Sequence, residues 1–267
     1  MGKFIAAMDN SGGSAGGALD AYKQSWTEEN KMDRIHNFRL RMIAAPDFNS
    51  DNIWAAIAYK DSVTRGISDF LKSKGIETYL KVDEGIDVNG MLKQFPLRQL
   101  IQLANDTGCT GTKMRSVINP EENYEVNVNQ IVSQQFGIAK DISDAGLMPI
   151  IEPEINIHHP DKAELEDILL QELDNHLQNF DGKCILKLTL PNKPNFYCDL
   201  LKHSVLYKIV ALSGGYNLAE ACDRLSQQKC MSASFSRALA DGLEYDMTDE
   251  KFNDVIGRNI KRIVKAS

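Results

Sequence analysis

The chain has 267 residues, of which 43% are hydrophobic and 25% charged, a mixture typical of a globular protein with one large core. Its net charge of −7 argues against a nucleic-acid partner, and no apolar run reaches the roughly 18 residues of a membrane span. The N-terminal apolar run is too short for a signal peptide and the five cysteines form no CxxC pair, so a reduced, cytoplasmic location is expected.

Short runs with strand-like composition alternate with segments of helical spacing along the chain. Eight such runs cover residues 4–9, 53–59, 76–82, 109–115, 148–155, 184–190, 208–212 and 230–235. Eight strands, each followed by a helix, within roughly 250 residues are typical of a (β/α)8 TIM barrel. We therefore expect an α/β fold with one TIM-barrel catalytic domain over residues 1–267. An open doubly wound sheet is the alternative, but no GxGxxG loop follows a strand.

The first and third runs end in polar residues, at the strand ends where a TIM barrel places its chemistry. Asp9 leads into a glycine-rich turn that contains Ser11 and Ser14, and such a turn at a helix start favours an anion. Lys81 closes the third run with Asp83 on the same face, which makes Lys81 a candidate partner for a phosphate or carboxylate. The simpler interpretations are a flexible turn and a plain salt bridge.

The fourth and fifth runs end in pairs of charges at a spacing of two residues, so each pair shares one face of its strand. Lys113 and Arg115 form the cationic pair, and Glu152 and Glu154 form the acidic pair. Two carboxylates in one space repel each other, which should raise the pKa of one of them. One could then act as a general acid and the other as a general base. The simpler interpretations are surface cations and a solvated strand end.

Lys187 lies alone in the apolar sixth run, residues 184–190. Aliphatic residues on both faces indicate a strand that is buried on both sides. A buried lysine must be paired or lose its proton, and a neutral, desolvated amine is a nucleophile that forms a Schiff base with a carbonyl. Taken alone, a structural ion pair is the simpler interpretation.

The last two runs end in a second group of potential anion ligands, where TIM barrels commonly bind phosphate. Ser213, Gly214 and Gly215 follow the seventh run, and Ser236 and Arg237 follow the eighth. Together with the serines after the first run, this predicts two anion sites with a lysine between them. The expected substrate is therefore a bisphosphorylated carbonyl compound.

No metal site is expected, because the adjacent His158 and His159 have no third ligand at a suitable spacing. We expect this histidine pair in a solvated loop.

Seven motifs, in order and in register, together resemble the class I fructose-bisphosphate aldolases, specifically the short bacterial form. They occupy residues 6–14, 80–85, 111–115, 149–154, 186–188, 212–215 and 234–239. The resemblance implies a lyase that cleaves fructose 1,6-bisphosphate reversibly into dihydroxyacetone phosphate and glyceraldehyde 3-phosphate in glycolysis or gluconeogenesis. It also implies a Schiff-base mechanism that uses no metal and no cofactor.

The resemblance also assigns catalytic roles to five residues. It makes Lys187 the Schiff-base lysine, Glu152 the proton shuttle and Glu154 its partner beside the amine. Lys113 assists carbinolamine formation, and Asp9 orients the amine and acts at the C4 hydroxyl. The tyrosine-ended tail with which the vertebrate enzymes exchange a proton has no counterpart here, so Glu152 is our candidate for protonating the enamine.

The resemblance further assigns residues to three parts of the substrate. The C1-phosphate site matches Ser213, Gly214, Gly215 and Arg237, the C6-phosphate site matches Ser11, Ser14 and Lys81, and Arg115 lies near the sugar. Ser236 stands where the vertebrate relatives have glycine, and its backbone N–H still serves the C1 phosphate.

Two other functions are also compatible with the sequence. One is another Schiff-base aldolase, of the tagatose-bisphosphate, transaldolase or deoxyribose-phosphate type. The other is a catalytically silent barrel that is retained for protein binding. The sequence leaves the oligomeric state open, a homo-oligomer included.

Overall fold

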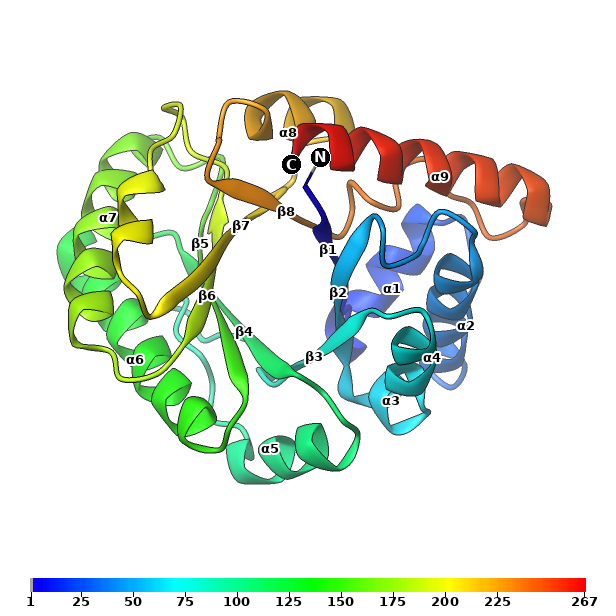
Figure 1. Cartoon of the computed structure of the whole chain (residues 1–267), viewed down its shortest axis with the longest axis horizontal. Coiled ribbons are helices and arrows are strands. Elements are labelled where there is room, and N and C mark those ends of the chain that lie inside the picture. Colours follow the sequence, from blue (N-terminus) through cyan, green and yellow to red (C-terminus); the bar gives the residue numbers. More distant parts are fainter. Residues whose placement is uncertain (1) are drawn as a thin grey trace.

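The computed structural model describes residues 2–267, and eight parallel strands close a barrel in chain order (Figure 1). The strands are β1 Phe4–Met8, β2 Ile53–Tyr59, β3 Glu77–Lys81, β4 Gly111–Ile118, β5 Met148–Ile155, β6 Cys184–Thr189, β7 Leu206–Leu212 and β8 Met231–Phe235. Each strand pairs with the next one, and β8 pairs with β1. The predicted (β/α)8 barrel and all eight of its strands are confirmed.

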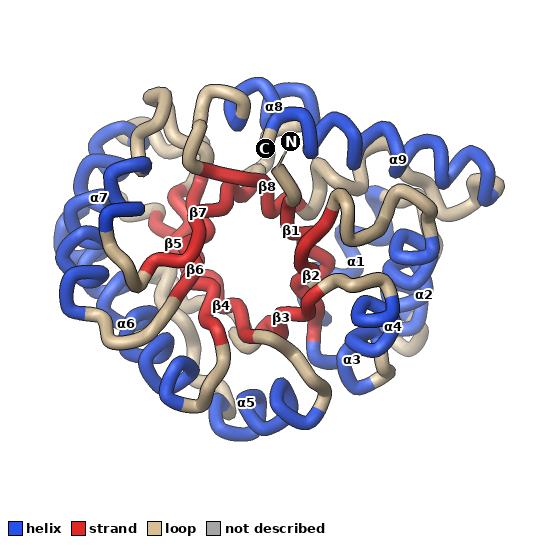
Figure 2. Tube along the Cα trace, viewed as in Figure 1, coloured by secondary structure: helices blue, strands red, loops and turns tan. Residues whose placement is uncertain are grey.

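Helices surround the strands on the outside of the barrel (Figure 2). They are α1 Gly12–Ala21, α2 Lys31–Ala44, α3 Lys60–Thr64, α4 Ile67–Ser73, α5 Leu97–Asp106, α6 Tyr124–Asp144, α7 Lys162–Asn179, α8 Leu218–Leu225 and α9 Asp249–Ala266. The amphipathic pattern explains the longest ones. In α6, for example, Val128, Ile131, Val132 and Ala139 recur at helical spacing and are all buried.

The prediction that a helix follows every strand is wrong after β6. The connection to β7 contains only the short 3-10 helix η1, Cys198–Lys202. The residues before it include Pro191 and Pro194, and Asn195 has a positive φ of 57°. Proline lacks the N–H that a helix interior needs, so this segment cannot form a regular helix.

The interior of the barrel follows the period of two that strands impose on side chains. One layer of inward side chains is apolar and nearly inaccessible to solvent. It contains Ile5, Ala7, Ala55, Ile57, Tyr79, Ile150, Ile185 and Val210. Two residues further along these strands, the same inward face carries charged residues such as Asp9, Glu152 and Lys187. The apolar layer therefore closes the barrel beneath a polar end.

Two contacts of the fold differ from simple sequence expectations. The five cysteines are not all reduced as expected, because Cys198 and Cys230 form a disulfide between η1 and the start of β8. Their spacing alone does not reveal this pair across 32 residues. His159 is buried, not solvated as expected. Its Nδ1 accepts from the Asp161 N–H at 3.1 Å, so its Nε2 carries the proton and donates to the Pro120 carbonyl at 2.7 Å.

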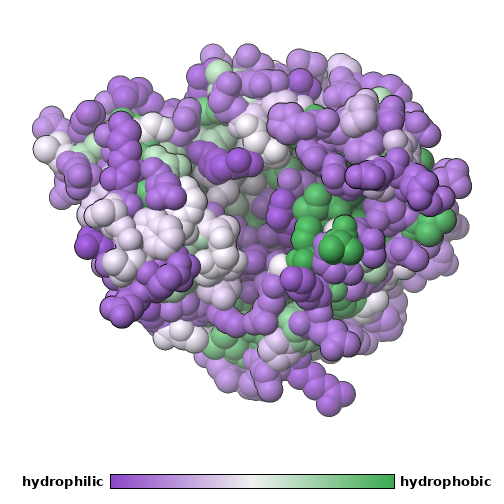
Figure 3. All heavy atoms as spheres, turned by 180° about the vertical axis from the view of Figure 1, so that it is seen from behind, coloured by the Kyte–Doolittle hydropathy of each residue, from purple (hydrophilic) through white to green (hydrophobic). Residues whose placement is uncertain are grey.

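The two ends of residues 2–267 lie side by side, and the Gly2 N–H donates to the Ser267 carbonyl at 3.1 Å (Figure 1). Seen from the other side of the barrel, the centre of the face is hollowed, with hydrophilic side chains around much of the hollow and a hydrophobic group on one side (Figure 3). Within residues 2–267, no helix has the length and apolar character that crossing a membrane requires.

Candidate active site

A cavity of about 790 Å³ opens where the strands end, and nearly all the predicted site residues line it. They are Asp9, Ser11, Ser14, Lys81, Lys113, Arg115, Glu152, Glu154, Lys187, Ser213, Gly214, Ser236 and Arg237. These residues come from seven of the eight strands or the loops that follow them, and the closed barrel brings their side chains together. Of the predicted set, only Gly215 does not contribute to the wall of the cavity.

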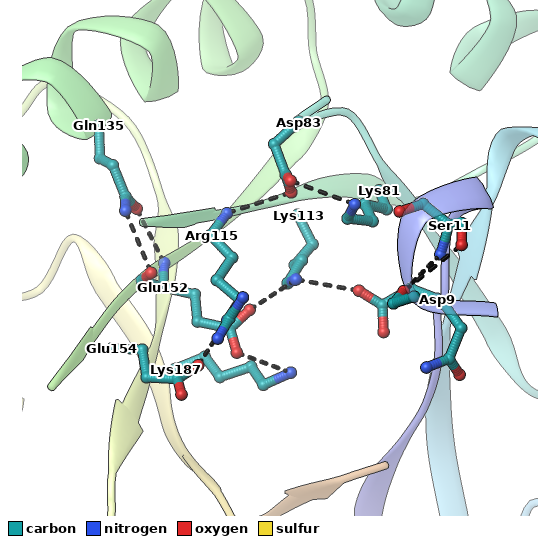
Figure 4. Close-up of polar contacts among 12 residues, drawn as sticks. Asp9, Ser11, Lys81, Asp83, Lys113, Arg115, Gln135, Glu152, Glu154 and Lys187 are labelled. Atoms are coloured by element: carbon teal, nitrogen blue, oxygen red, sulfur yellow. Dashed lines mark hydrogen bonds and ion pairs between the residues drawn. The ribbon is translucent and has the colours of Figure 1, made fainter. Parts of the chain in front are cut away.

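Lys187 lies at the bottom of this cavity. Its side chain points inward from β6 and is only 5% exposed, and its Nζ lies 3.1 Å from Glu152 Oε1 (Figure 4). The inward orientation follows from the alternation along β6, because Ile185 occupies the apolar layer below. The amine is therefore desolvated, with a carboxylate within reach of its proton.

Lys113 links Glu152 to Asp9 and completes an alternating row of charges. Its Nζ lies 2.7 Å from Glu152 Oε2 and donates to Asp9 Oδ2 at 2.9 Å (Figure 4). Burial alone would lower the pKa of Lys113, but Asp9 and Glu152 more than reverse this, so the pKa of Lys113 is raised. Burial likewise acts to raise the pKa of Asp9, but Lys113 and Lys187 hold it below its usual value. Both groups therefore remain charged.

The second acidic residue of β5 has a different cationic partner. Glu154 Oε2 accepts from Arg115 Nε at 2.5 Å. Burial acts to lower the pKa of Arg115, and the contact with Glu154 outweighs it, so the pKa of Arg115 is raised. The two glutamates share a face as predicted, but each is balanced by cations. The carboxylate within ion-pair distance of Lys187 is that of Glu152.

Asp83 joins the third strand to the fourth at the rim of the cavity. Its Oδ1 lies 3.2 Å from Lys81 Nζ, and its Oδ2 accepts from the Arg115 backbone N–H at 3.2 Å. The predicted salt bridge between Lys81 and Asp83 is therefore present. Because the side chain of Lys81 is still 10% exposed and lines the cavity, it remains available to a ligand.

The start of α1 brings Ser11 and Ser14 to one side of the cavity. The Ser11 N–H donates to Ser14 Oγ at 3.0 Å, and the backbone of Ser11 has the extended conformation of an N-cap. The N-terminus of this helix faces the cavity, and its partial positive charge favours an anion. The two hydroxyls and the helix end together form a surface suited to phosphate.

A glycine turn after β7 and the end of β8 form the opposite side. Gly214 and Gly215 both have positive φ, 59° and 120°, which side chains other than glycine rarely adopt. A Cβ built on Gly215 would lie 3.5 Å from Arg237 Nη2, so the turn lies directly against this guanidinium. Ser213 and Ser236 also line the cavity here.

Two residues that hold the acidic strand in place escape the sequence analysis. The Gln135 side chain bonds to the backbone of Glu152, and Thr189 Oγ1 bonds to the backbone of Ile155. A signal for Gln135 exists, because it is a polar residue at a core position of the apolar stripe of α6. Thr189 follows Lys187 on the strand by two residues, but nothing in the sequence marks it.

No group of three or more His, Cys, Asp or Glu side chains with metal-binding geometry occurs among residues 2–267. Of the histidine pair next to Pro160, His159 bonds to backbone atoms through both ring nitrogens, and His158 is exposed.

Comparison with known proteins gives a consistent result, although no protein-family model matches the chain. The chain is 41% identical over 281 residues to the fructose-bisphosphate aldolase class 1 of Clostridium acetobutylicum, covering 99% of this chain and 95% of that protein. The structure superposes with a TM-score of 0.82 on the fructose-bisphosphate aldolase of Plasmodium falciparum, solved in complex with TRAP and a small-molecule inhibitor. That match has 19% identity and covers 99% and 90% of the two chains.

A second solved structure is more distant. It is an archaeal fructose-1,6-bisphosphate aldolase whose catalytic lysine is covalently bound to the carbinolamine intermediate of the substrate. It matches with a TM-score of 0.55 and 12% identity over 97% of this chain and 93% of its own. At these identities the two structural matches establish the fold.

Proposed function

Because the chain belongs to the class 1 fructose-bisphosphate aldolases, we propose that it cleaves fructose 1,6-bisphosphate through a Schiff base on Lys187. The products are dihydroxyacetone phosphate and glyceraldehyde 3-phosphate, and the reaction is reversible. One observation carries the assignment of the nucleophile: a buried lysine amine at the bottom of the cavity, 3.1 Å from a carboxylate that can accept its proton.

The first half of the reaction makes the imine. Glu152 takes a proton from the Lys187 ammonium, and the free amine attacks the C2 carbonyl of the open-chain sugar to give a carbinolamine. Glu152 then returns a proton to the C2 hydroxyl, which leaves as water while the C=N bond forms. Lys113, 2.7 Å from Glu152, stabilises the negative charge that develops during these transfers.

The second half breaks the C3–C4 bond. Asp9 remains ionised because its pKa is low, and it takes the proton of the C4 hydroxyl. The electron pair of the C3–C4 bond moves into the protonated imine, which gives an enamine and releases glyceraldehyde 3-phosphate. The proton that Asp9 has taken passes through Lys113, which contacts both carboxylates, to Glu152. Glu152 delivers it to C3 of the enamine, and hydrolysis of the resulting imine releases dihydroxyacetone phosphate and restores Lys187.

The remaining predicted residues hold the substrate at its two ends. We assign the C1 phosphate to the glycine turn and Arg237, and the C6 phosphate to the start of α1 and Lys81. Arg115 and Glu154 lie between these ends, next to the sugar. The glycolytic role implied by the family favours a cytoplasmic location for the barrel, which we take as a single catalytic unit without metal or cofactor.

Reduction with borohydride in the presence of fructose 1,6-bisphosphate tests this proposal. Peptide mass mapping should place the reduced adduct on Lys187, and Lys187→Met should show neither label nor turnover. Turnover of the wild type should persist after exhaustive chelation. A label on Lys113 instead, or turnover by Lys187→Met, would contradict the mechanism. Comparison of bisphosphate with monophosphate sugars separates this activity from that of a transaldolase-like enzyme.

A further inference from the structure

The strand that carries Glu152, β5, stops pairing with its neighbour β6 just before the residues of the proposed reaction. β5 pairs with β6 only at Ile150 and Ile151. Pro153 follows Glu152, and proline has no N–H to donate to a neighbouring strand. The β5–β6 ladder therefore does not extend to the residues that carry the two carboxylates.

Side chains replace the missing ladder at Glu152. Gln135 extends from α6, and its Oε1 accepts from the Glu152 N–H at 2.9 Å while its Nε2 donates to the Glu152 carbonyl at 3.1 Å (Figure 4). One amide thus satisfies both peptide groups of a single residue. Because Gln135 is fully buried, water cannot substitute for it.

A second clamp of the same kind holds the far end of the strand. Thr189 Oγ1 accepts from the Ile155 N–H and donates to the Ile155 carbonyl, both at 2.9 Å. The two clamps lie on either side of Glu154. Because the backbone is held at both Glu152 and Ile155, this end of β5 can neither slide along the barrel axis nor rotate relative to Lys187.

We propose that Gln135 is a positioning residue for the reaction, which acts by holding the Glu152 carboxylate between Lys187 and Lys113. The inference rests on the proposed function in one respect, since it requires Glu152 to transfer protons. The geometry leaves little tolerance, because the same carboxylate must remain 3.1 Å from one nitrogen and 2.7 Å from the other. A displacement of the backbone by about 1 Å would lengthen one of the two contacts beyond transfer distance.

The first test replaces the amide by a side chain of similar shape. Gln135→Met keeps the volume and removes both bonds, and we expect kcat to fall roughly 10- to 100-fold with KM within about threefold. The rate at which borohydride traps the imine in a single turnover should fall with kcat. An adjacent residue provides a matched control, because Gln134 clamps Leu92 in the same way, at 2.8 and 3.0 Å. Leu92 does not line the cavity, so Gln134→Met should retain wild-type kcat.

The second test is a rescue that a merely structural role would not predict. In Gln135→Glu, an ionised carboxylate can accept from the Glu152 N–H but cannot donate to its carbonyl, whereas the protonated acid can do both. Relative to the wild type, kcat of this variant should therefore rise as the pH falls from roughly 9 to 6. This readout compares the kcat of folded Gln135→Glu with that of the wild type at each pH. It therefore still tests the positioning role if Gln135→Met does not fold.

The outcomes separate this inference from the proposed function. A wild type that neither turns over fructose 1,6-bisphosphate nor traps at Lys187 overturns the proposed function. If the wild type is active, a Gln135→Met variant with unchanged kcat overturns the positioning role. So does a Gln135→Glu variant whose kcat ratio to the wild type is independent of pH. A selective loss of kcat, with rescue at low pH, supports the role.

Discussion

Removal of the Glu152 carboxylate by the change Glu152→Gln should impair stability and catalysis together. The side chains of Lys113, Glu152 and Lys187 are 2%, 3% and 5% exposed, so water screens none of them. In the wild type one carboxylate lies within ion-pair distance of both ammonium groups. In the variant Asp9 is the remaining carboxylate in this row of charges, and it contacts Lys113 alone. Lys187 is left without its anion.

The magnitude follows from the burial of these groups. Loss of one partner of a buried ion pair costs about 3 to 5 kcal/mol, and we take the lower end because glutamine keeps the shape and one acceptor oxygen. For a domain of this size, about 3 kcal/mol corresponds to a fall in Tm of roughly 6 to 12 °C. Loss of the proton-transfer group should reduce kcat by about 10²- to 10⁴-fold.

Glu154→Gln is the matched comparison on the same strand. Its partner Arg115 has a side chain that is 42% exposed, so loss of that pair should cost about 1 kcal/mol or less. Urea unfolding followed by circular dichroism gives the two stabilities, and single-turnover trapping with borohydride gives the rate of imine formation. If Glu152→Gln is as stable as Glu154→Gln and traps at the wild-type rate, the row of buried charges does not act as we describe.

Three further outcomes are expected. Burial raises the pKa of the Cys184 thiol from 9.0 to about 12, so its contribution to stability is complete below pH 9 and is lost as the pH rises toward 12. The free energy of unfolding should fall by about 1.4 kcal/mol per pH unit from this group, and Cys184→Ala should show a shallower alkaline slope in urea melts. Denatured, unreduced protein should react with three equivalents of a thiol reagent and reduced protein with five; five without reduction would disprove the Cys198–Cys230 bond. Arg237→Ala should raise KM for fructose 1,6-bisphosphate about 10- to 100-fold through loss of a charge-assisted contact to phosphate, and an unchanged KM would place the C1 phosphate elsewhere.

The sequence predicts the charged centre because the period of two in a strand is a local rule. Once Ile185 is taken as part of the inner layer, Lys187 must follow it on the same face, and the same step connects Ile150 to Glu152. Closure of the barrel then brings these ends together without any further information. The barrel itself follows from eight strand-like runs of suitable spacing.

The supporting contacts could not be predicted in this way, because they depend on tertiary geometry. The Gln135 amide reaches the backbone of Glu152 only because α6 packs on β5. In the sequence, a polar residue within the apolar stripe of α6 is unusual, but the pattern does not indicate which group it contacts. The Cys198–Cys230 bond likewise requires η1 to lie against the start of β8. The Glu154–Arg115 ion pair also depends on tertiary geometry, because the sequence places Lys113 and Arg115 on the same face of β4 and does not distinguish them as partners.

The distribution of charge explains why a substrate with two phosphates suits this cavity. At the bottom, Asp9 and Glu152 balance Lys113 and Lys187, so the reacting carbon meets no net charge from these four groups. The donors suited to phosphate, such as Arg237 and the start of α1, lie around the mouth. The two phosphates would thus be bound at the two ends of the cavity, while the four charged groups at the bottom transfer protons among themselves and the substrate. The binding free energy of the two phosphates can then serve to align C2 of the substrate with the Lys187 amine. A substrate that lacks one phosphate should therefore have a lower kcat as well as a lower affinity.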